Sequence, residues 1–276
     1  MANRWHPRID PADPRAPSAV VWAALSEDER RQVVDSLPSE MPKDLLPPPE
    51  GDRHRKARER PTQALDAFFR RSGRKVYVSS DLAVYYPDER MFAPDLFAVL
   101  DVEPFDREKW VVSAEGRGLD FVLEVVYLGD PRKDLVENVE RYARLGIPEY
   151  FVYDRRRGRL TGFSLSQGGA YRPLVPQRGL WPSAVLGLDL TLEGERLRFI
   201  AGTAFVPELE ELAVRAESLL AEAVVRRDEL ESKLALAEAR AAEEKARAAE
   251  EKARADRLER ETAELHAELE RLRRRM

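Results

Sequence analysis

The sequence of 276 residues contains no cysteine. This absence excludes disulfide bonds, zinc sites built from thiolates and cysteine nucleophiles. The sequence also lacks any apolar run close to the ~18 residues that a membrane-spanning helix requires. Its first residues, MANRWHPRIDP, contain no apolar segment of a secretion signal. We therefore expect a cytoplasmic protein without a membrane partner.

Neither sign of charge is in large excess. The chain has 46 Lys and Arg residues and 51 Asp and Glu residues, which gives a net charge of -5. Residues 1–206 carry 31 basic and 32 acidic residues, and residues 207–276 carry 15 and 19. This balance excludes a protein that binds nucleic acid through its overall charge alone. A glycine-rich phosphate loop, a Ser-His-Asp set and a zinc-ligand spacing are also missing from the sequence.

The distribution of proline marks a separate N-terminal region. Ten of the 19 prolines lie within the first 61 residues. Residues 10–17 and 38–49 predict extended linker, because proline fixes its own φ and offers no backbone donor. Between them, SEDERRQVVDSL predicts a short helix in which Ser26 and Glu29 form a capping box. We assign residues 1–50 to this region.

The middle of the chain alternates helical and extended patterns. ARERPTQALDAFFRRSG predicts a helix that ends at Gly73, and KVYVSS, DLAVYY and DLFAVLDV predict strands. After a loop that contains Trp110 and runs to about Gly118, DFVLEVVY predicts a strand, DLVENVERYARLG a helix and EYFVYD another strand. Further antiparallel strands are predicted for RLTGFSL, AYRPLVP and LDLTLEGERLRFI. The last of these segments predicts a hairpin that turns at Gly194. This order predicts one α/β domain over residues 51–206, with a mixed β-sheet flanked by helices.

The last part of the chain, residues 207–276, has a heptad pattern. The segment AAEEKAR occurs twice in succession, over residues 241–254. Two series with a spacing of seven residues carry Leu230, Leu258, Leu265 and Leu272 and, offset by three or four positions, Leu234 and Leu269. They predict a long helix that forms a coiled coil, either with a second copy of the chain or with a different partner. A solitary helix supported by i,i+4 charge pairs is the alternative.

The strand LDFVLEVV places a carboxylate in an apolar environment. Along it, Val122, Glu124 and Val126 share one face, and the other face is also apolar. A strand that is apolar on both faces is typical of the centre of a mixed or parallel sheet. Because an unpaired carboxylate is costly there, Glu124 must be neutralised, paired with a cation or bound to a metal ion.

A second acid, Asp95, begins the earlier strand DLFAVLDV. Two acids on neighbouring strands of one sheet can hold Mg²⁺ or Mn²⁺ through their carboxylates, with water and substrate phosphate completing the ligand set. A structural ion pair between Glu124 and an arginine or lysine explains the same pattern. Spacing alone does not separate these two interpretations.

Three segments, MFAPDLFAVLDV, LDFVLEVV and KDLVENVERYARLGIPEYFVYD, resemble the Uma-type restriction endonuclease family within the PD-(D/E)XK nuclease superfamily. The resemblance covers about residues 51–199, and it includes neither the N-terminal region nor the heptad segment. It implies a restriction-endonuclease-like core, Mg²⁺ or Mn²⁺ as cofactor and DNA as substrate. The metal-binding acids of the family match Asp95 and Glu124, and a further aspartate of the family matches Asp134.

The sequence departs from this family at the catalytic lysine. The superfamily places a lysine two residues after the glutamate, where this chain has Val126, or on the following helix, where it has Asn138. Such a lysine orients the attacking water and stabilises charge on the phosphate, and an amide supplies no charge. The cations that can replace it or contact nucleic acid are Arg132, Lys133 and Arg141. Two functions follow: a metal-dependent endonuclease acting on DNA, or a catalytically inactive nuclease-fold protein that binds or scaffolds through its coiled coil.

Overall fold

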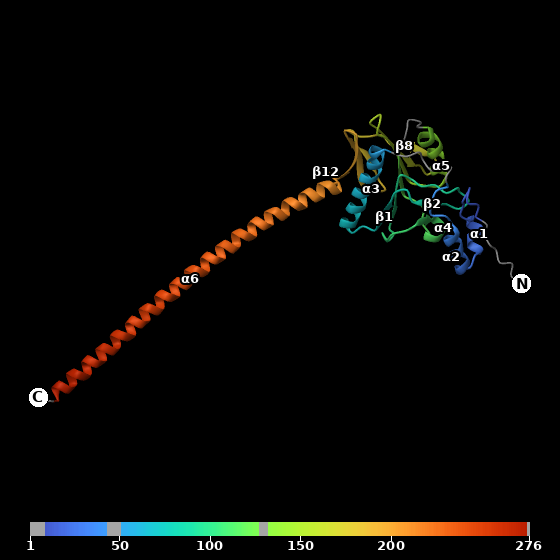
Figure 1. Cartoon of the computed structure of the whole chain (residues 1–276). Coiled ribbons are helices and arrows are strands. Elements are labelled where there is room, and N and C mark those ends of the chain that lie inside the picture. Colours follow the sequence, from blue (N-terminus) through green and yellow to red (C-terminus); the bar gives the residue numbers. More distant parts are fainter. Residues whose placement is uncertain (1–8, 43–50, 127–131, 275–276) are drawn as a thin grey trace. The chain divides into compact units, whose positions relative to one another are not determined.

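The computed structural model describes residues 9–42, 51–126 and 132–274, apart from the side chain of Leu272. The chain forms two compact units, Met1–Leu212 and Ala213–Met276 (Figure 1). Within the described residues, no helix is both long enough and apolar enough to cross a membrane. The division into residues 1–50, 51–206 and 207–276 stays a prediction about which parts fold alone.

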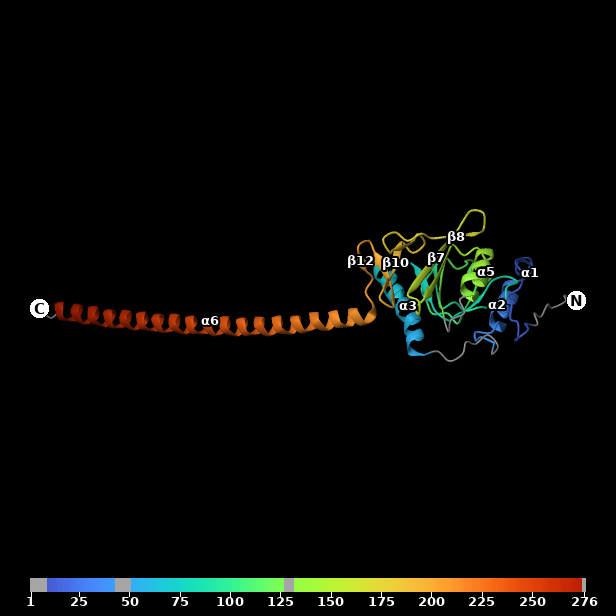
Figure 2. The same ribbon diagram turned by 90° about the horizontal axis from the view of Figure 1, so that it is seen from above.

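A six-stranded mixed sheet forms the centre of the first unit. Its strands are, in spatial order, β1 (Val76–Ser79), β3 (Leu96–Leu100), β5 (Phe121–Val125), β6 (Glu149–Asp154), β7 (Arg159–Leu165) and β8 (Tyr171–Pro173). β5 and β6 run parallel, and the other neighbouring pairs run antiparallel. Helices cover both faces of the sheet (Figure 2). The predicted α/β class, with a mixed sheet flanked by helices, is therefore confirmed.

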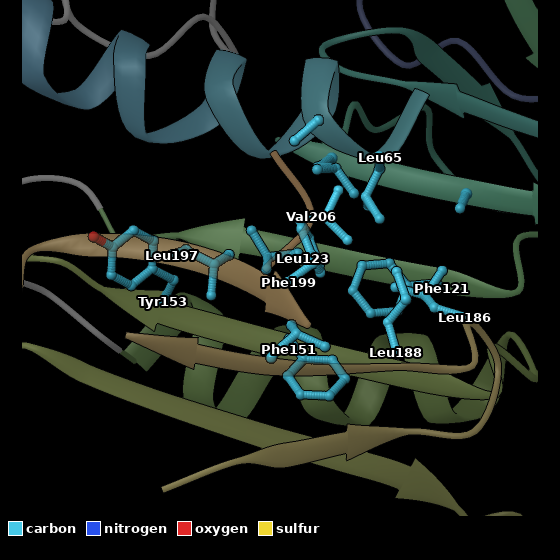
Figure 3. Close-up of a cluster of buried hydrophobic side chains, with 14 of the residues drawn as sticks. Leu65, Phe121, Leu123, Phe151, Tyr153, Leu186, Leu188, Leu197, Phe199 and Val206 are labelled. Atoms are coloured by element: carbon cyan, nitrogen blue, oxygen red, sulfur yellow. The ribbon is translucent and has the colours of Figure 1, made fainter. Parts of the chain in front are cut away.

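One face of this sheet packs against α3 (Asp52–Ser72) and against a second, four-stranded sheet. The second sheet contains, in spatial order, β12 (Ala204–Phe205), β11 (Arg196–Ala201), β10 (Leu188–Glu193) and β9 (Trp181–Ser183). Figure 3 shows the apolar side chains between these layers, with Leu65 from α3, Phe121 and Phe151 from the main sheet, and Leu188 and Phe199 from the second sheet. This cluster is the larger part of the core.

The other face packs against α5 (Asn138–Arg144) and a parallel pair of strands, β2 (Ala83–Tyr85) and β4 (Lys109–Val111). A π-helical turn, η1 (Lys133–Glu137), leads into α5. The predicted loop around Trp110 is wrong, because Trp110 lies in β4 and is completely buried, and α4 (Val112–Glu115) follows it. A strand of three residues is too short to show a period-2 pattern in the sequence.

The N-terminal region packs on the outer side of β2 and β4. It contains α1 (Ala19–Ala24) and α2 (Glu27–Ser36), and the buried Val33 belongs to the same apolar cluster as Tyr85. The segment 10–17 does not form a free linker, since Ala16 is 2% exposed and forms a bridge with Pro87. Of the second predicted linker, residues 43–50 lie outside the described part of the chain.

Several predicted ends and turns are confirmed. Ser26 and Glu29 form the capping box at the start of α2. α3 ends at Gly73, whose φ of 70° is a left-handed conformation that glycine adopts without strain. The hairpin of β10 and β11 turns at Gly194. Short-range patterns thus determined these boundaries.

The long C-terminal helix is confirmed as α6 (Leu209–Arg273). In the single chain its leucines at positions 230, 234, 258, 265 and 269 are between 52% and 63% exposed. The heptad series also contain Leu272, whose side chain lies outside the described part of the chain. The five exposed leucines are available to a partner helix.

The first turn of α6 belongs to the first unit and contacts a buried arginine. Arg198 of β11 is 5% exposed, and its two terminal nitrogens donate to the two carboxylate oxygens of Glu211, each at 3.0 Å. The buried Glu208 lies 3.9 Å from Arg198 and 4.0 Å from Arg60. Loss of Glu208 and Glu211 would leave a buried guanidinium with fewer partners.

We expect a chain that ends after Leu212 to be more stable than a chain that ends after Pro207. Both lack the heptads, but only the longer chain keeps Glu208 and Glu211 beside Arg198. The free energy of unfolding should differ by about 2 kcal/mol, as for hydrogen bonds to a charged group. Urea unfolding followed by circular dichroism measures the difference. Superimposable curves would show that the domain ends before α6, near the predicted residue 206.

Candidate functional site

Glu124 lies in β5, where every residue is buried. Phe121, Leu123 and Val125 belong to the cluster under α3, whereas Val122 belongs to the cluster under α5. The predicted burial of both strand faces is therefore confirmed. Because side chains alternate along a strand, Glu124 points to the α5 side, where it is 6% exposed.

Asp95 lies immediately before β3 and opposite Glu124. β3 and β5 are antiparallel with Leu96 opposite Leu123, and the same register continued by one residue pairs Asp95 with Glu124. The backbone N–H of Asp95 donates to Glu124 Oε2 at 3.3 Å. Oδ2 of Asp95 accepts from the backbone N–H of Val125 at 2.7 Å. The structure thus brings the two acids together at one end of adjacent strands.

Tyr142 of α5 fixes the other oxygen of Glu124. Its hydroxyl donates to Glu124 Oε1 at 2.6 Å, and the tyrosine itself is 1% exposed. Sequence reasoning did not assign Tyr142 to the site. Its spacing of four residues from Asn138 and eight from Asp134 places all three on one helix face, and this spacing was the available signal.

Burial raises the pKa of the Glu124 carboxyl well above its ordinary value. Repulsion from Asp95 and Asp134 adds to this effect, whereas Lys133 and the hydrogen bond from Tyr142 act in the opposite direction. In the part of the chain that the structure describes, no cationic side chain forms an ion pair with Glu124. The structural ion pair considered from the sequence is therefore not observed there.

Arg58 of α3 contacts the second acid. Its Nη1 lies 3.5 Å from Asp95 Oδ1, and its Nε lies 3.0 Å from Asp81 Oδ2. Nothing in the basic run DRHRKARER distinguished Arg58 from its neighbours, because its contact with Asp95 spans 37 positions of the chain. Arg58 thus partly neutralises the charge of Asp95, whereas Glu124 has no such ion pair among the described residues.

Asn138 occupies the position where the family pattern has a lysine, and it is buried at 4% exposure. Its Nδ2 donates to Asp134 Oδ1 at 3.2 Å, and the hydroxyl of Tyr150 donates to the carbonyl of Asp134 at 2.8 Å. Asp134 is itself 7% exposed. The side-chain amide of Asn138 therefore donates a hydrogen bond to Asp134 and adds no positive charge to the site.

The three predicted cations differ in their surroundings. Arg132 and Lys133 are exposed at the start of η1, and the charge of Lys133 acts on the pKa of Glu124. Arg141 instead donates to the carbonyl of Arg90 at 2.6 Å, lies 3.1 Å from Glu89 and stacks over a phenylalanine ring. Of these three cations, Lys133 is the one whose charge acts on the pKa of Glu124.

The donor set fits a hard divalent cation held by few protein ligands. Asp95 and Glu124 offer carboxylate oxygens with lone pairs beyond the hydrogen bonds described above. A bound cation would also offset the cost of burying Glu124. Among the described residues, no group of three or more His, Asp or Glu side chains is placed to hold a metal ion. The arrangement therefore fits a divalent cation that takes one or two carboxylates and completes its ligand set with water, and the described residues do not form an all-protein cage.

Comparison with known proteins gives a family match and similarity to solved structures. A family model described as "Uma2: Putative restriction endonuclease" matches residues 44–193, a range that includes Asp95, Glu124, Asp134 and Asn138. A crystal structure described as a "putative nuclease belonging to DUF820", from Anabaena variabilis ATCC 29413, is similar with 12% sequence identity and a TM-score of 0.42. This similarity covers 54% of the present chain and 82% of the other chain. No curated protein matches the sequence.

Proposed function

The chain belongs to the Uma2 family, and we propose that it is a metal-dependent endonuclease that hydrolyses DNA phosphodiesters. The observation that supports this function best is the pairing of Glu124 with Asp95 on the adjacent strand, since Glu124 is buried and forms no ion pair with any cation among the described residues. A buried carboxylate with a raised pKa beside a second carboxylate is typical of a functional site.

Asp95 and Glu124 are the residues that would hold the metal ion. When bound, a divalent ion neutralises phosphate charge and lowers the pKa of a water ligand. The surrounding residues position the two carboxylates. Tyr142 fixes the orientation of Glu124 through Oε1, and Arg58 and the N–H of Val125 fix Asp95. These contacts preorganise the acids before substrate binds.

Hydrolysis of a phosphodiester also requires a cation for the charge that develops on the phosphate. Water forms a new P–O bond, the P–O bond to one sugar breaks, and the departing sugar oxygen takes up a proton. We assign the cation to Lys133, whose ammonium is exposed at the start of η1 and acts on the pKa of Glu124. Asn138 supplies no charge, and its donor is used by Asp134.

The proposal includes a cytoplasmic location and self-association through α6. A second copy of the chain would cover the heptad leucines, which are more than half exposed in the single chain. Under this proposal the nuclease domain folds alone, and α6 brings two such domains together on one DNA molecule. Light scattering of the full chain and of the chain ending after Leu212 tests the oligomeric state.

Plasmid nicking tests the proposed activity. With Mg²⁺ or Mn²⁺, the protein should convert supercoiled plasmid to the open circular form, and excess EDTA should stop the reaction. Ca²⁺ serves as a control, because it also binds carboxylates but prefers more ligands and a larger site. Absence of nicking with any divalent metal, on both supercoiled and single-stranded circular DNA, would count against the enzyme.

A catalytically inactive binding or scaffold protein is the second candidate function. The buried Asn138, at the position of the family lysine, and the exposed heptad leucines favour it. Such a protein would still bind metal at the acid pair, so Mg²⁺ or Mn²⁺ would raise its melting temperature without nicking. The two measurements together distinguish an inactive protein with an intact acid pair from an enzyme.

A further inference from the structure

A basic cavity of about 320 Å³ opens between α3, the end of β6 and the hairpin of β10 and β11. Five cationic residues line it: Arg53, Lys56, Arg60, Arg155 and Arg196. The acids in its lining are Glu195 and Glu208. Positive charge therefore exceeds negative charge in this cavity, although the whole chain carries a net charge of -5.

The two acidic residues neutralise positive charge in only one part of the cavity. Arg155 lies 3.2 Å from Glu195, and Glu208 lies 4.0 Å from Arg60 and 3.8 Å from Arg196. Arg53 and Lys56 are exposed, and neither has a carboxylate partner among the residues that the structure describes. Both lie in the first turns of α3, a helix of 21 residues, whose N-terminal N–H groups also favour an anion.

Two series of residue contacts connect this cavity with the acid pair. Tyr153 lines the cavity and lies opposite Val125 in the parallel register of β5 and β6, and the N–H of Val125 donates to Asp95. Tyr153 and Val125 both belong to the cluster under α3, whereas Glu124 points to the α5 side, so the cavity opens on the opposite face of the strands that carry the acids. Along α3, Arg60 lines the cavity, whereas Arg58, two residues before it, reaches Asp95. The cavity and the acids thus share one end of the main sheet.

The wall of the cavity also has an apolar part. Tyr153 and Leu197 lie next to each other at one end of the core cluster (Figure 3), and both contribute to the lining together with Pro61. A site that combines several guanidinium groups with a flat apolar surface suits a phosphate joined to a sugar. Arginine is suited to it because its planar fork matches two phosphate oxygens at once.

We propose that this cavity binds a backbone phosphate of the nucleic acid strand, at the same end of the sheet as the acid pair. This inference rests on the proposed function, because it assigns a substrate subsite to the same enzyme. The cavity would fix the position of the strand, and the acid pair would act on another linkage of the same strand. Contacts to phosphate position a nucleic acid without reading its sequence.

Fluorescence anisotropy with a fluorescein-labelled duplex tests this subsite. The full-length double variant Arg53→Ala/Lys56→Ala is compared with the wild type in Ca²⁺, which permits binding under conditions that limit cleavage. We expect affinity to fall at least about tenfold, and the slope of log K against log salt to become shallower by roughly 1, for the one phosphate that the cavity would neutralise. Both substituted side chains are exposed, so circular dichroism melts should match the wild type.

The double variant Arg31→Ala/Arg71→Ala is the matched control, because it removes the same charge at exposed positions outside the cavity. It should bind DNA with nearly the affinity and salt slope of the wild type. Equal losses in both variants would overturn the subsite in favour of overall charge. An unchanged slope in the cavity variant, or no binding of duplex or single-stranded DNA by the wild type at low salt, would also overturn it. The EDTA-sensitive nicking assay is scored separately, so activity with an unchanged salt slope would reject the subsite and keep the endonuclease.

Discussion

Glu124→Gln should abolish metal-dependent nicking and, in EDTA, make the protein more stable. Both oxygens of Glu124 accept hydrogen bonds in the buried site. In the glutamine variant, the side-chain oxygen can still accept from the N–H of Asp95, and the side-chain nitrogen can donate to the hydroxyl oxygen of Tyr142. At a pH where Glu124 is ionised, the variant removes a buried charge that has no ion pair among the described residues, which should raise the free energy of unfolding by roughly 1–3 kcal/mol. For a domain of this size, that corresponds to about 2–4 °C in Tm per kcal/mol. Nicking should fall at least about a hundredfold.

The pH dependence of stability gives an independent test of the same residue. Because the pKa of Glu124 is raised by burial and then by Asp95 and Asp134, the folded state binds a proton more tightly than the unfolded state. Without metal, the wild type should therefore lose stability as pH rises through the folded-state pKa, and Glu124→Gln should not show this loss. The advantage of the variant in EDTA should thus increase with pH.

Addition of metal should reverse the order of stability. Mg²⁺ or Mn²⁺ that binds the folded wild type raises its Tm by mass action, and the glutamine variant should show no such shift. Glu140→Gln is a suitable control, since Glu140 is an exposed residue of α5 on the helix that carries Tyr142. If millimolar metal leaves the Tm of the wild type unchanged, and Glu124→Gln is no more stable than Glu140→Gln in EDTA, the acid pair is not a metal site.

The environment of Glu124 could be predicted because it depends on a local pattern. The alternation in β5 assigns each side chain to a face, and the two faces do belong to two separate apolar clusters. The capping box of α2 and the turn at Gly194 also depend on residues close together in the sequence. The opposition of Asp95 and Glu124 needed only the inference that their strands are neighbours.

The contacts that complete the site depend on long-range packing, which one sequence does not encode in a readable pattern. Tyr142 has an apolar ring that packs like other core residues, and only its hydroxyl at the tip contacts Glu124. Arg58 is one of several basic residues in its segment, and its contact depends on how α3 passes the end of the sheet. The packing of Ala16 beneath Pro87 likewise follows from tertiary structure, since a proline-rich segment is extended both in a linker and in a packed strap.

Lys133→Ala should slow metal-dependent nicking by about a hundredfold, or roughly 3 kcal/mol, the usual cost of losing a charged contact to a developing negative charge. Folding should be unchanged, because Lys133 is exposed. Arg132→Ala is the matched control, since it removes the same charge from the adjacent exposed residue. If the charge at position 133 is needed, and not the overall charge of the protein, Arg132→Ala should change the nicking rate less than about threefold.

Asn138→Lys in the Lys133→Ala background tests the position that the family pattern assigns to the lysine. Residue 138 is buried beside Asp134, so a lysine there would be held charged by that carboxylate, and the repulsion that Asp134 exerts on Glu124 would decrease. We expect nicking to recover about tenfold, short of the full rate, because Asp134 would attract the ammonium away from the substrate phosphate. Plasmid nicking measures the rate, and thermal melts measure folding, for the wild type, Lys133→Ala, Arg132→Ala and the double variant Lys133→Ala/Asn138→Lys.

If Lys133→Ala nicks as fast as the wild type and Asn138→Lys adds nothing, neither position supplies the catalytic charge. If no variant nicks at all while each retains its metal-induced rise in Tm, the acids bind metal without catalysis, and the binding or scaffold function replaces the endonuclease.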